Sequence, residues 1–171
     1  MILSFKQKFP WEEETFFEEK ILLSAGLIAC NRQHGIKPLL PSILFKDEYK
    51  PKRHTIRQSD RIKPGTILHM ATGVRSKNYN QFNKDIPELA KCRATQRFDL
   101  TYRKNNVVAL YIDKVLMFCR NREHLYEITP GWMQQFVEND GFRDEVHFFM
   151  WFTKPVRNGR IIHWTDLIYN P

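Results

Sequence analysis

Residues 52–57 read Lys-Arg-His-Thr-Ile-Arg, and a turn at Pro64-Gly65 separates them from the apolar run Thr-Ile-Leu-His-Met. A β-branched Thr-Ile pair favours an extended backbone, and Pro-Gly favours a tight turn. The sequence therefore predicts two successive strands, at about 54–58 and 66–72. Five more runs on either side of this segment are also typical of strands: 2–6, 92–102, 107–112, 115–118 and 161–168.

Three short helices are expected between these strands. Thr15 and Glu18 have the spacing of a capping box, and Gly26 would end that helix. Thr129-Pro130 is typical of a helix start, and Gly141 of its end. A third helix is expected from near Asp144, with apolar residues at helical spacing.

Numerous short antiparallel strands with a few helices indicate the α+β class, and such strands most readily curl into a small barrel. We expect one domain over 1–171, because no linker, repeat or low-complexity tract divides it. Residues 27–51, with three prolines, indicate a long loop, and 73–87 a polar, exposed excursion from the sheet.

The chain has 27 basic and 19 acidic residues, which gives a formal net charge of +8. Such an excess favours a polyanionic partner, most commonly nucleic acid, although a basic protein without such a partner is the alternative. The basic residues gather around the quoted segment, at Lys50, Lys52, Arg53, Arg57, Arg61, Lys63, Arg75 and Lys77.

The sequence does not indicate a membrane-spanning protein, a signal peptide or a metal-binding protein. No apolar run approaches the roughly 18 residues that span a bilayer, and the first residues are expected to form a strand and not a signal peptide. An odd number of distant cysteines, Cys30, Cys92 and Cys119, favours a reduced, cytoplasmic setting. The six histidines show no metal-ligand spacing, so neither a metal nor a cofactor is expected.

Lys52 and Thr55 are candidates for a base and a nucleophile. Positions three apart on a regular strand point to opposite faces, so the two side chains can meet only if the chain bends between them. A free lysine with a pKa near 10.4 is only about one part in 2,500 neutral at pH 7, so catalysis requires Lys52 to be desolvated or pressed by cations. The alternative is that these are solvated charges beside an ordinary strand.

Glu138 is the third candidate. It falls in the last turn of the second predicted helix, where the helix dipole disfavours a carboxylate. It is either exposed and unimportant or held by a partner such as Lys52 or Arg57. Most aromatic residues are expected in the core, but Tyr79 lies in a polar loop and could stack on a base.

The segments Lys-Arg-His-Thr-Ile-Arg at 52–57, Pro-Gly-Thr-Ile-Leu at 64–68 and Glu-Asn-Asp-Gly-Phe at 138–142 resemble the ASCH domain of the PUA-like superfamily. That resemblance implies a β-barrel flanked by helices and a cleft for RNA or modified nucleosides. Small bacterial members hydrolyse the amide of N4-acetylcytidine, which implies a catalytic trio of Lys52, Thr55 and Glu138. Relative to them, 27–51 and 73–91 would be insertions.

Two functions of different class follow. One is an amidohydrolase acting on an acylated nucleoside, with Thr55 attacking the carbonyl and Lys52 as its base. The other is a non-catalytic module that binds RNA or a nucleotide in the same basic cleft. The residues Arg53, Arg57, Arg75, Lys77 and Tyr79 are the expected binding residues in either case.

Overall fold

The α+β class expected from the sequence is confirmed. A computed structural model describes residues 1–27, 50–103, 107–121 and 124–170, and its sheets are mostly antiparallel. The strands in chain order are β1 (Ile2–Ser4), β2 (His54–Arg57), β3 (His69–Thr72), β4 (Asn80–Gln81), β5 (Ala94–Arg103), β6 (Val107–Ile112), β7 (Val115–Arg120), β8 (Leu125–Glu127) and β9 (Val156–His163). The helices are α1 (Phe17–Ser24), α3 (Trp132–Asn139), α4 (Glu145–Trp151) and a short 3-10 turn, η2 (Pro87–Leu89).

The strands form two sheets in the described part of the chain. The larger has the order β2-β9-β5-β6-β7-β8 and is antiparallel throughout. The smaller has the order β1-β3-β4, and its β1–β3 pair is parallel. The hydrogen-bonded ladders of these residues do not close into a barrel, because β2 and β8 end the larger sheet without pairing with each other.

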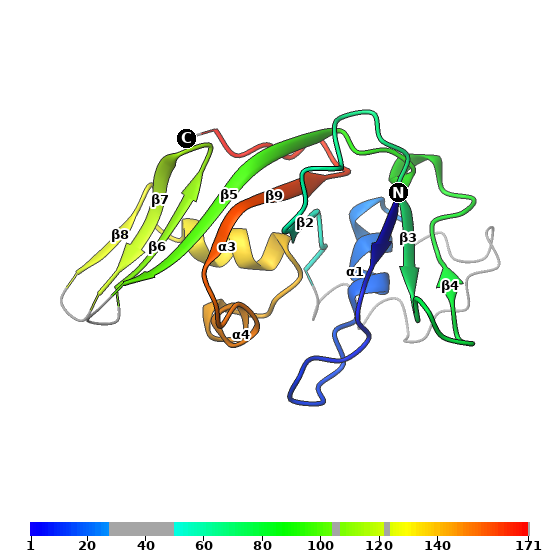
Figure 1. Cartoon of the computed structure of the whole chain (residues 1–171), viewed down its shortest axis with the longest axis horizontal. Coiled ribbons are helices and arrows are strands. Elements are labelled where there is room, and N and C mark those ends of the chain that lie inside the picture. The colour runs from blue at the N-terminus through cyan, green and yellow to red at the C-terminus, as the bar shows by residue number, and fades with distance from the viewer. Residues whose placement is uncertain (28–49, 104–106, 122–123, 171) are drawn as a thin grey trace.

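One hydrophobic cluster joins the two sheets and the helices. On β5, Phe98 and Leu100 are fully buried on one face, and Phe98 stacks on Phe136 of α3 with ring centroids 5.9 Å apart. Figure 1 shows α3 and α4 on this same side of the sheet, whereas α1 lies beside the smaller sheet. Strand β5 thus buries alternate residues, as a strand covered on one face requires.

Two local features agree with the sequence: a turn lies between the strands expected at 107–112 and 115–118, and α4 starts near Asp144. Asp113 and Lys114, between β6 and β7, have φ angles of 49° and 73°, which is the turn with two positive φ angles that closes a tight hairpin. Asp144 is the N-cap of α4, and its carboxylate accepts a hydrogen bond from the His147 amide at 2.9 Å.

The predicted start of α3 at Thr129-Pro130 is wrong. The helix begins at Trp132 after Gly131, whose φ is 75°, and Glu127 of β8 supplies the cap from outside the helix. Its carboxylate oxygens each accept a hydrogen bond at 3.0 Å, one from the Gly131 amide and the other from the Met133 amide. A cap provided by a neighbouring strand leaves no Ser or Thr signature.

Other boundaries also differ. The last strand was expected at 161–168, but β9 already begins at Val156. Strand β8 was not expected, and the predicted insertion at 73–91 contains the two-residue β4 and the turn η2. Most of the expected loop and insertion at 27–51 lies outside the described residues.

Candidate functional site

The segment 52–57 lies between two helices before it enters the larger sheet. The Lys52 amide donates to the carbonyl of Lys20 in α1 at 2.9 Å, and the Arg53 amide donates to the carbonyl of Asn139 at the end of α3 at 2.7 Å. These long-range backbone bonds bring the Lys-Arg-His-Thr stretch against the Glu-Asn-Asp stretch. The structure therefore places the two motifs of the sequence side by side.

Lys52 is the most buried charged side chain of this region, with 1% of its surface exposed. Its ammonium donates to the carboxylate of Asp140 at 2.5 Å and to the Asp140 carbonyl oxygen, and it lies 4.5 Å from the ring centroid of Phe17. Burial lowers the pKa of Lys52 to about 8, although the Asp140 carboxylate opposes this shift.

Asp140 was not singled out by sequence reasoning, although it follows the Glu-Asn pair directly. Burial raises the pKa of its carboxyl group, while Lys52, Arg57 and the Ile56 amide favour the ionised form. Lys52 and Asp140 thus form a hydrogen-bonded buried pair, in which each partner satisfies the other.

Thr55 lies on β2, opposite Ile162 of β9, and is buried. No hydrogen bond joins its hydroxyl group to Lys52 or Glu138 among the residues that the structure describes. Lys52 precedes the strand, and its ammonium points to Asp140. In this conformation the expected base and nucleophile are not engaged with each other.

Glu138 is held within its own helix. Its carboxylate accepts a hydrogen bond at 2.9 Å from the amide of Gln134, which also donates to the Arg143 carbonyl at 3.0 Å. The carboxylate partner of Lys52 is therefore Asp140, and Glu138 is left to face a pocket.

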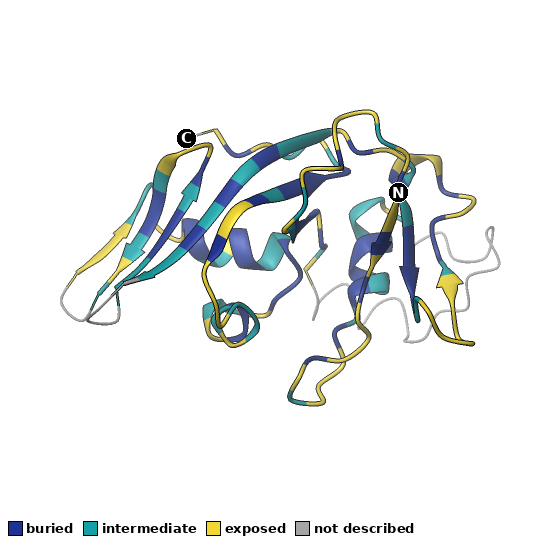
Figure 2. Cartoon of the chain, viewed as in Figure 1, coloured by how far each residue is buried: buried dark blue, intermediate teal, exposed yellow. Residues whose placement is uncertain are grey.

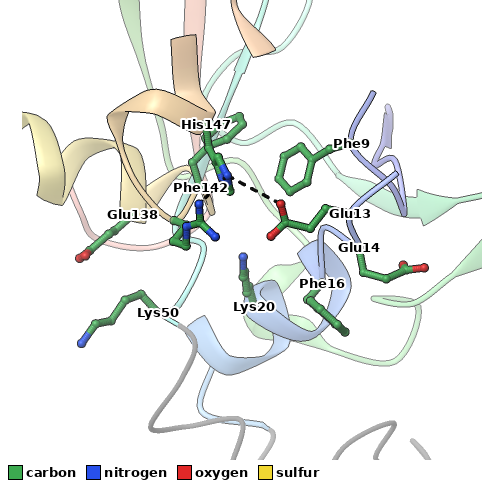
Figure 3. A pocket seen from close by; sticks show the side chains of 10 residues that line it. Phe9, Glu13, Glu14, Phe16, Lys20, Lys50, Glu138, Phe142 and His147 are labelled. Atoms are coloured by element: carbon green, nitrogen blue, oxygen red, sulfur yellow. Dashed lines mark hydrogen bonds and ion pairs between the residues drawn. The ribbon is translucent and has the colours of Figure 1, made fainter. Parts of the chain in front are cut away.

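This pocket, of about 360 Å³, lies between α1, the turn before it and the segment from α3 to α4. Figure 3 shows Lys20 pointing from α1 toward the centre of the pocket. Aromatic rings and charges of both signs form its lining, which consists of Phe9, Glu13, Glu14, Phe16, Lys20, Lys50, Glu138, Phe142, Arg143 and His147. The lining contains three carboxylates, two lysines and one arginine, so it is nearly neutral overall.

Lys20 is a residue of the pocket lining whose pKa is lowered by its surroundings. Its ammonium donates to the Gly141 carbonyl at 2.8 Å. Burial and the neighbouring positive charge of Lys52 lower the pKa of Lys20 to about 8. Lys20 was missed by the sequence reasoning because a lysine within an amphipathic helix is ordinarily exposed.

His147 connects two of the pocket charges. Its Nε2 lies 2.8 Å from the guanidinium of Arg143 and 3.7 Å from the carboxylate of Glu13 (Figure 3). Because a guanidinium can only donate, Nε2 is the acceptor in the contact with Arg143. Glu13 is thus a carboxylate beside His147 in the pocket lining.

Tyr169 ties the two motifs together from the C-terminal segment. Its hydroxyl group lies 2.8 Å from Nε2 of His54 and accepts a hydrogen bond at 3.2 Å from the Asn139 side-chain amide. Burial raises the pKa of this hydroxyl, so it stays protonated. The position of Tyr169 far from both motifs in the chain gave no signal of this role.

The expected binding residues are spread over the surface. Arg53 is exposed before β2, and Arg57 is half-buried at the end of it. Arg75, Lys77 and Tyr79 are exposed on the connection from β3 to β4. The described lining of the pocket includes none of these five.

The described residues contain no group of three or more His, Cys, Asp or Glu side chains that could hold a metal ion. None of their helices has the length and apolar character required to cross a membrane. In comparisons with known proteins, no family model, no curated protein and no solved structure matches this chain.

Proposed function

We propose that this protein is an ASCH-type domain that binds a nucleoside, including modified cytidines, in the pocket lined by Lys20 and Glu138. In this proposal the smaller sheet is the second part of an open PUA-like barrel. The observation that carries the proposal is the pocket itself, because it combines aromatic rings with charged hydrogen-bonding groups of both signs.

The size and charge of the pocket favour a nucleoside over a larger or strongly charged ligand. Pockets for small molecules usually measure about 300–1,000 Å³, and this one is near the lower limit. A nearly neutral lining suits a neutral polar ring with its ribose, whereas a polyphosphate would meet the carboxylates of Glu13 and Glu138. Phe9, Phe16 and Phe142 supply apolar surface for a base.

Calorimetric titration with cytidine and with N4-acetylcytidine tests this proposal. We expect both to bind to the wild type. Glu138→Gln should weaken binding about 10-fold, because a hydrogen bond to a carboxylate exceeds one to a neutral amide by about 1 kcal/mol or more. Glu88→Gln, an exposed glutamate on η2, is the charge-matched control and should bind like the wild type. Absence of binding to the wild type, or equal losses in both variants, would contradict the proposal.

Hydrolysis of an acylated nucleoside is the second candidate, and the low pKa of Lys52 favours it. With a pKa of about 8, roughly one lysine in ten is neutral at pH 7, compared with one in 2,500 for a free lysine. Catalysis further requires Lys52 to leave Asp140 and reach the Thr55 hydroxyl group. Chromatography of cytidine released from N4-acetylcytidine tests this candidate, with Thr55→Ala and Lys52→Ala expected to abolish release. Binding without any release by the wild type would leave the binding function alone.

A further inference from the structure

Three arginines stand in one row across neighbouring strands of the larger sheet. In the strand register, Arg57 of β2 lies opposite Arg160 of β9, which in turn lies opposite Arg97 of β5. Side chains at paired positions leave the sheet on the same face, about 5 Å from one strand to the next. Like charges placed directly opposite each other are destabilising. We refer to Arg57, Arg160 and Arg97 as the arginine row.

The arginine row lies on the face of the sheet that α3 and α4 leave uncovered. Along β5, Gln96 and Phe98 are buried, and Phe98 packs on Phe136 of α3. Arg97 and Asp99 alternate with them along the strand and are half-exposed. Figure 2 shows this alternation of buried and half-exposed residues along β5. The row is thus on the opposite side of the larger sheet from α3, whose last turn contributes Glu138 to the pocket.

The negative charge on this face is small. Arg97 donates to the carboxylate of Asp99 at 2.6 Å, and this carboxylate also accepts a hydrogen bond from the Asn158 amide at 2.8 Å. Asp99 also attracts Arg160, although no hydrogen bond to the Arg160 guanidinium is found in the described part of the chain. The Arg57 guanidinium donates a hydrogen bond to the Ser4 carbonyl oxygen at 2.7 Å. Asp99 is therefore the carboxylate near Arg97 and Arg160, whereas the buried Asp140 attracts Arg57.

An aromatic ring continues the same face. Tyr111 of β6 lies opposite Asp99 in the register and is half-exposed. A guanidinium binds phosphate through two parallel hydrogen bonds, and a flat ring beside such cations offers a surface on which a base can stack. Acidic peptides can use the cations, but they have no base to place on Tyr111.

We propose that this face of β2, β9, β5 and β6 binds a single strand of nucleic acid, with the arginine row on phosphates and Tyr111 beneath a base. The net charge of +8 on the whole chain gives such a polyanion a favourable approach. This surface goes beyond the proposed nucleoside pocket and does not depend on it.

Fluorescence anisotropy with labelled 12-residue oligouridylate and oligothymidylate tests the surface at two or more salt concentrations. We expect Arg160→Gln to weaken binding 3- to 10-fold and to reduce the slope of log Kd against log salt by roughly 0.7, the value for one lost phosphate contact on a single strand. Arg160→Lys should retain most of the affinity. Tyr111→Leu should weaken binding at every salt concentration with the slope unchanged.

Lys84→Gln is the control, because it removes one exposed cation elsewhere and leaves the arginine row intact. Equal losses in Lys84→Gln and Arg160→Gln, or no loss in Arg160→Gln, would overturn the proposal. Competition by a poly-glutamate peptide as strong as by the oligonucleotides would overturn it in favour of an acidic protein partner. A stronger effect on oligouridylate than on oligothymidylate assigns the surface to RNA, and the reverse assigns it to DNA. Cytidine titration of Arg160→Gln separates this result from the pocket, since pocket binding should be unchanged.

Discussion

At the residue scale, the charge of the buried Lys52 is compensated by the buried carboxylate of Asp140. Both Lys52 and Asp140 are almost completely buried, and their ammonium and carboxylate are 2.5 Å apart. Removing one partner of such a pair leaves the other charge in a medium that solvates it poorly, whereas removing both is much less costly. The pair therefore holds the Lys-Arg-His-Thr segment against the end of α3.

Asp140→Ala should lower the free energy of unfolding by about 3 kcal/mol, because it leaves Lys52 buried without a counter-charge. The double variant with Lys52→Met should recover a large part of that loss, since no charge then remains unpaired. Urea denaturation of the wild type, both single variants and the double variant measures this coupling. Strictly additive losses would show that the two side chains do not stabilise each other.

His163 provides a second test at this scale. It is fully buried, neither of its ring nitrogens has a hydrogen bond partner in the described part of the chain, and burial lowers its pKa to about 4. Between pH 6.5 and 4 the unfolded state therefore binds a proton that the folded state does not, so this residue destabilises the fold as the pH falls. The effect should reach ~3 kcal/mol near pH 4.

His163→Met removes this contribution and keeps an apolar side chain of suitable size. The difference in unfolding free energy between variant and wild type should grow in favour of the variant from pH 6.5 to pH 4. Urea denaturation at a series of pH values measures it, and contributions from other groups, such as Glu18, cancel in the difference. A difference that is constant with pH would contradict the neutral state of His163.

At the scale of elements, helix α3 depends on β8 for its N-terminal cap. Glu127→Ala should cost about 1–2 kcal/mol, because the amides of Gly131 and Met133 both lose their acceptor. Glu127→Gln keeps one acceptor oxygen and should cost less. Thermal unfolding followed by circular dichroism compares the two. Equal stability of Glu127→Ala and the wild type would contradict the cap.

The elements also show what could be predicted from sequence. The hairpin of β6 and β7, the strand β2 and the N-cap Asp144 depend on local turn and strand preferences, and they were found. The start of α3 was not, because its cap comes from Glu127 on another element. The first half of β9 was missed since Asn158, with a φ of 54°, and Gly159 interrupt the apolar pattern.

In the candidate site too, local sequence features could be predicted, whereas features that depend on tertiary contacts could not. The Lys-Arg-His-Thr and Glu-Asn-Asp segments were recognised from the sequence, and the structure places them in contact. Which carboxylate meets Lys52 could not be read from the sequence, because Glu138 and Asp140 differ by two positions at a helix end and point in different directions. Lys20 and Tyr169 join the site only through tertiary contacts.

At the scale of the whole molecule, the two proposed binding surfaces are separate from each other. The pocket lies among α1, α3 and α4, and the arginine row lies on the face of the larger sheet opposite to α3. Because the two surfaces share no residue, a saturating concentration of cytidine should leave the affinity for oligouridylate within twofold. Anisotropy titrations with and without cytidine measure this. A competitive shift of tenfold or more would show that one surface binds both ligands.

The central claim is that a nucleoside binds in the pocket lined by Lys20 and Glu138. Cytidine titration followed by two-dimensional amide NMR tests it most directly, because a chain of 20.6 kDa gives resolved spectra and each signal reports its own location. We predict saturable shifts at Phe9, Lys20, Glu138 and Phe142, with those of β7 and β8 unchanged. Shifts confined to residues outside the pocket, or no shifts at millimolar cytidine, would contradict the account.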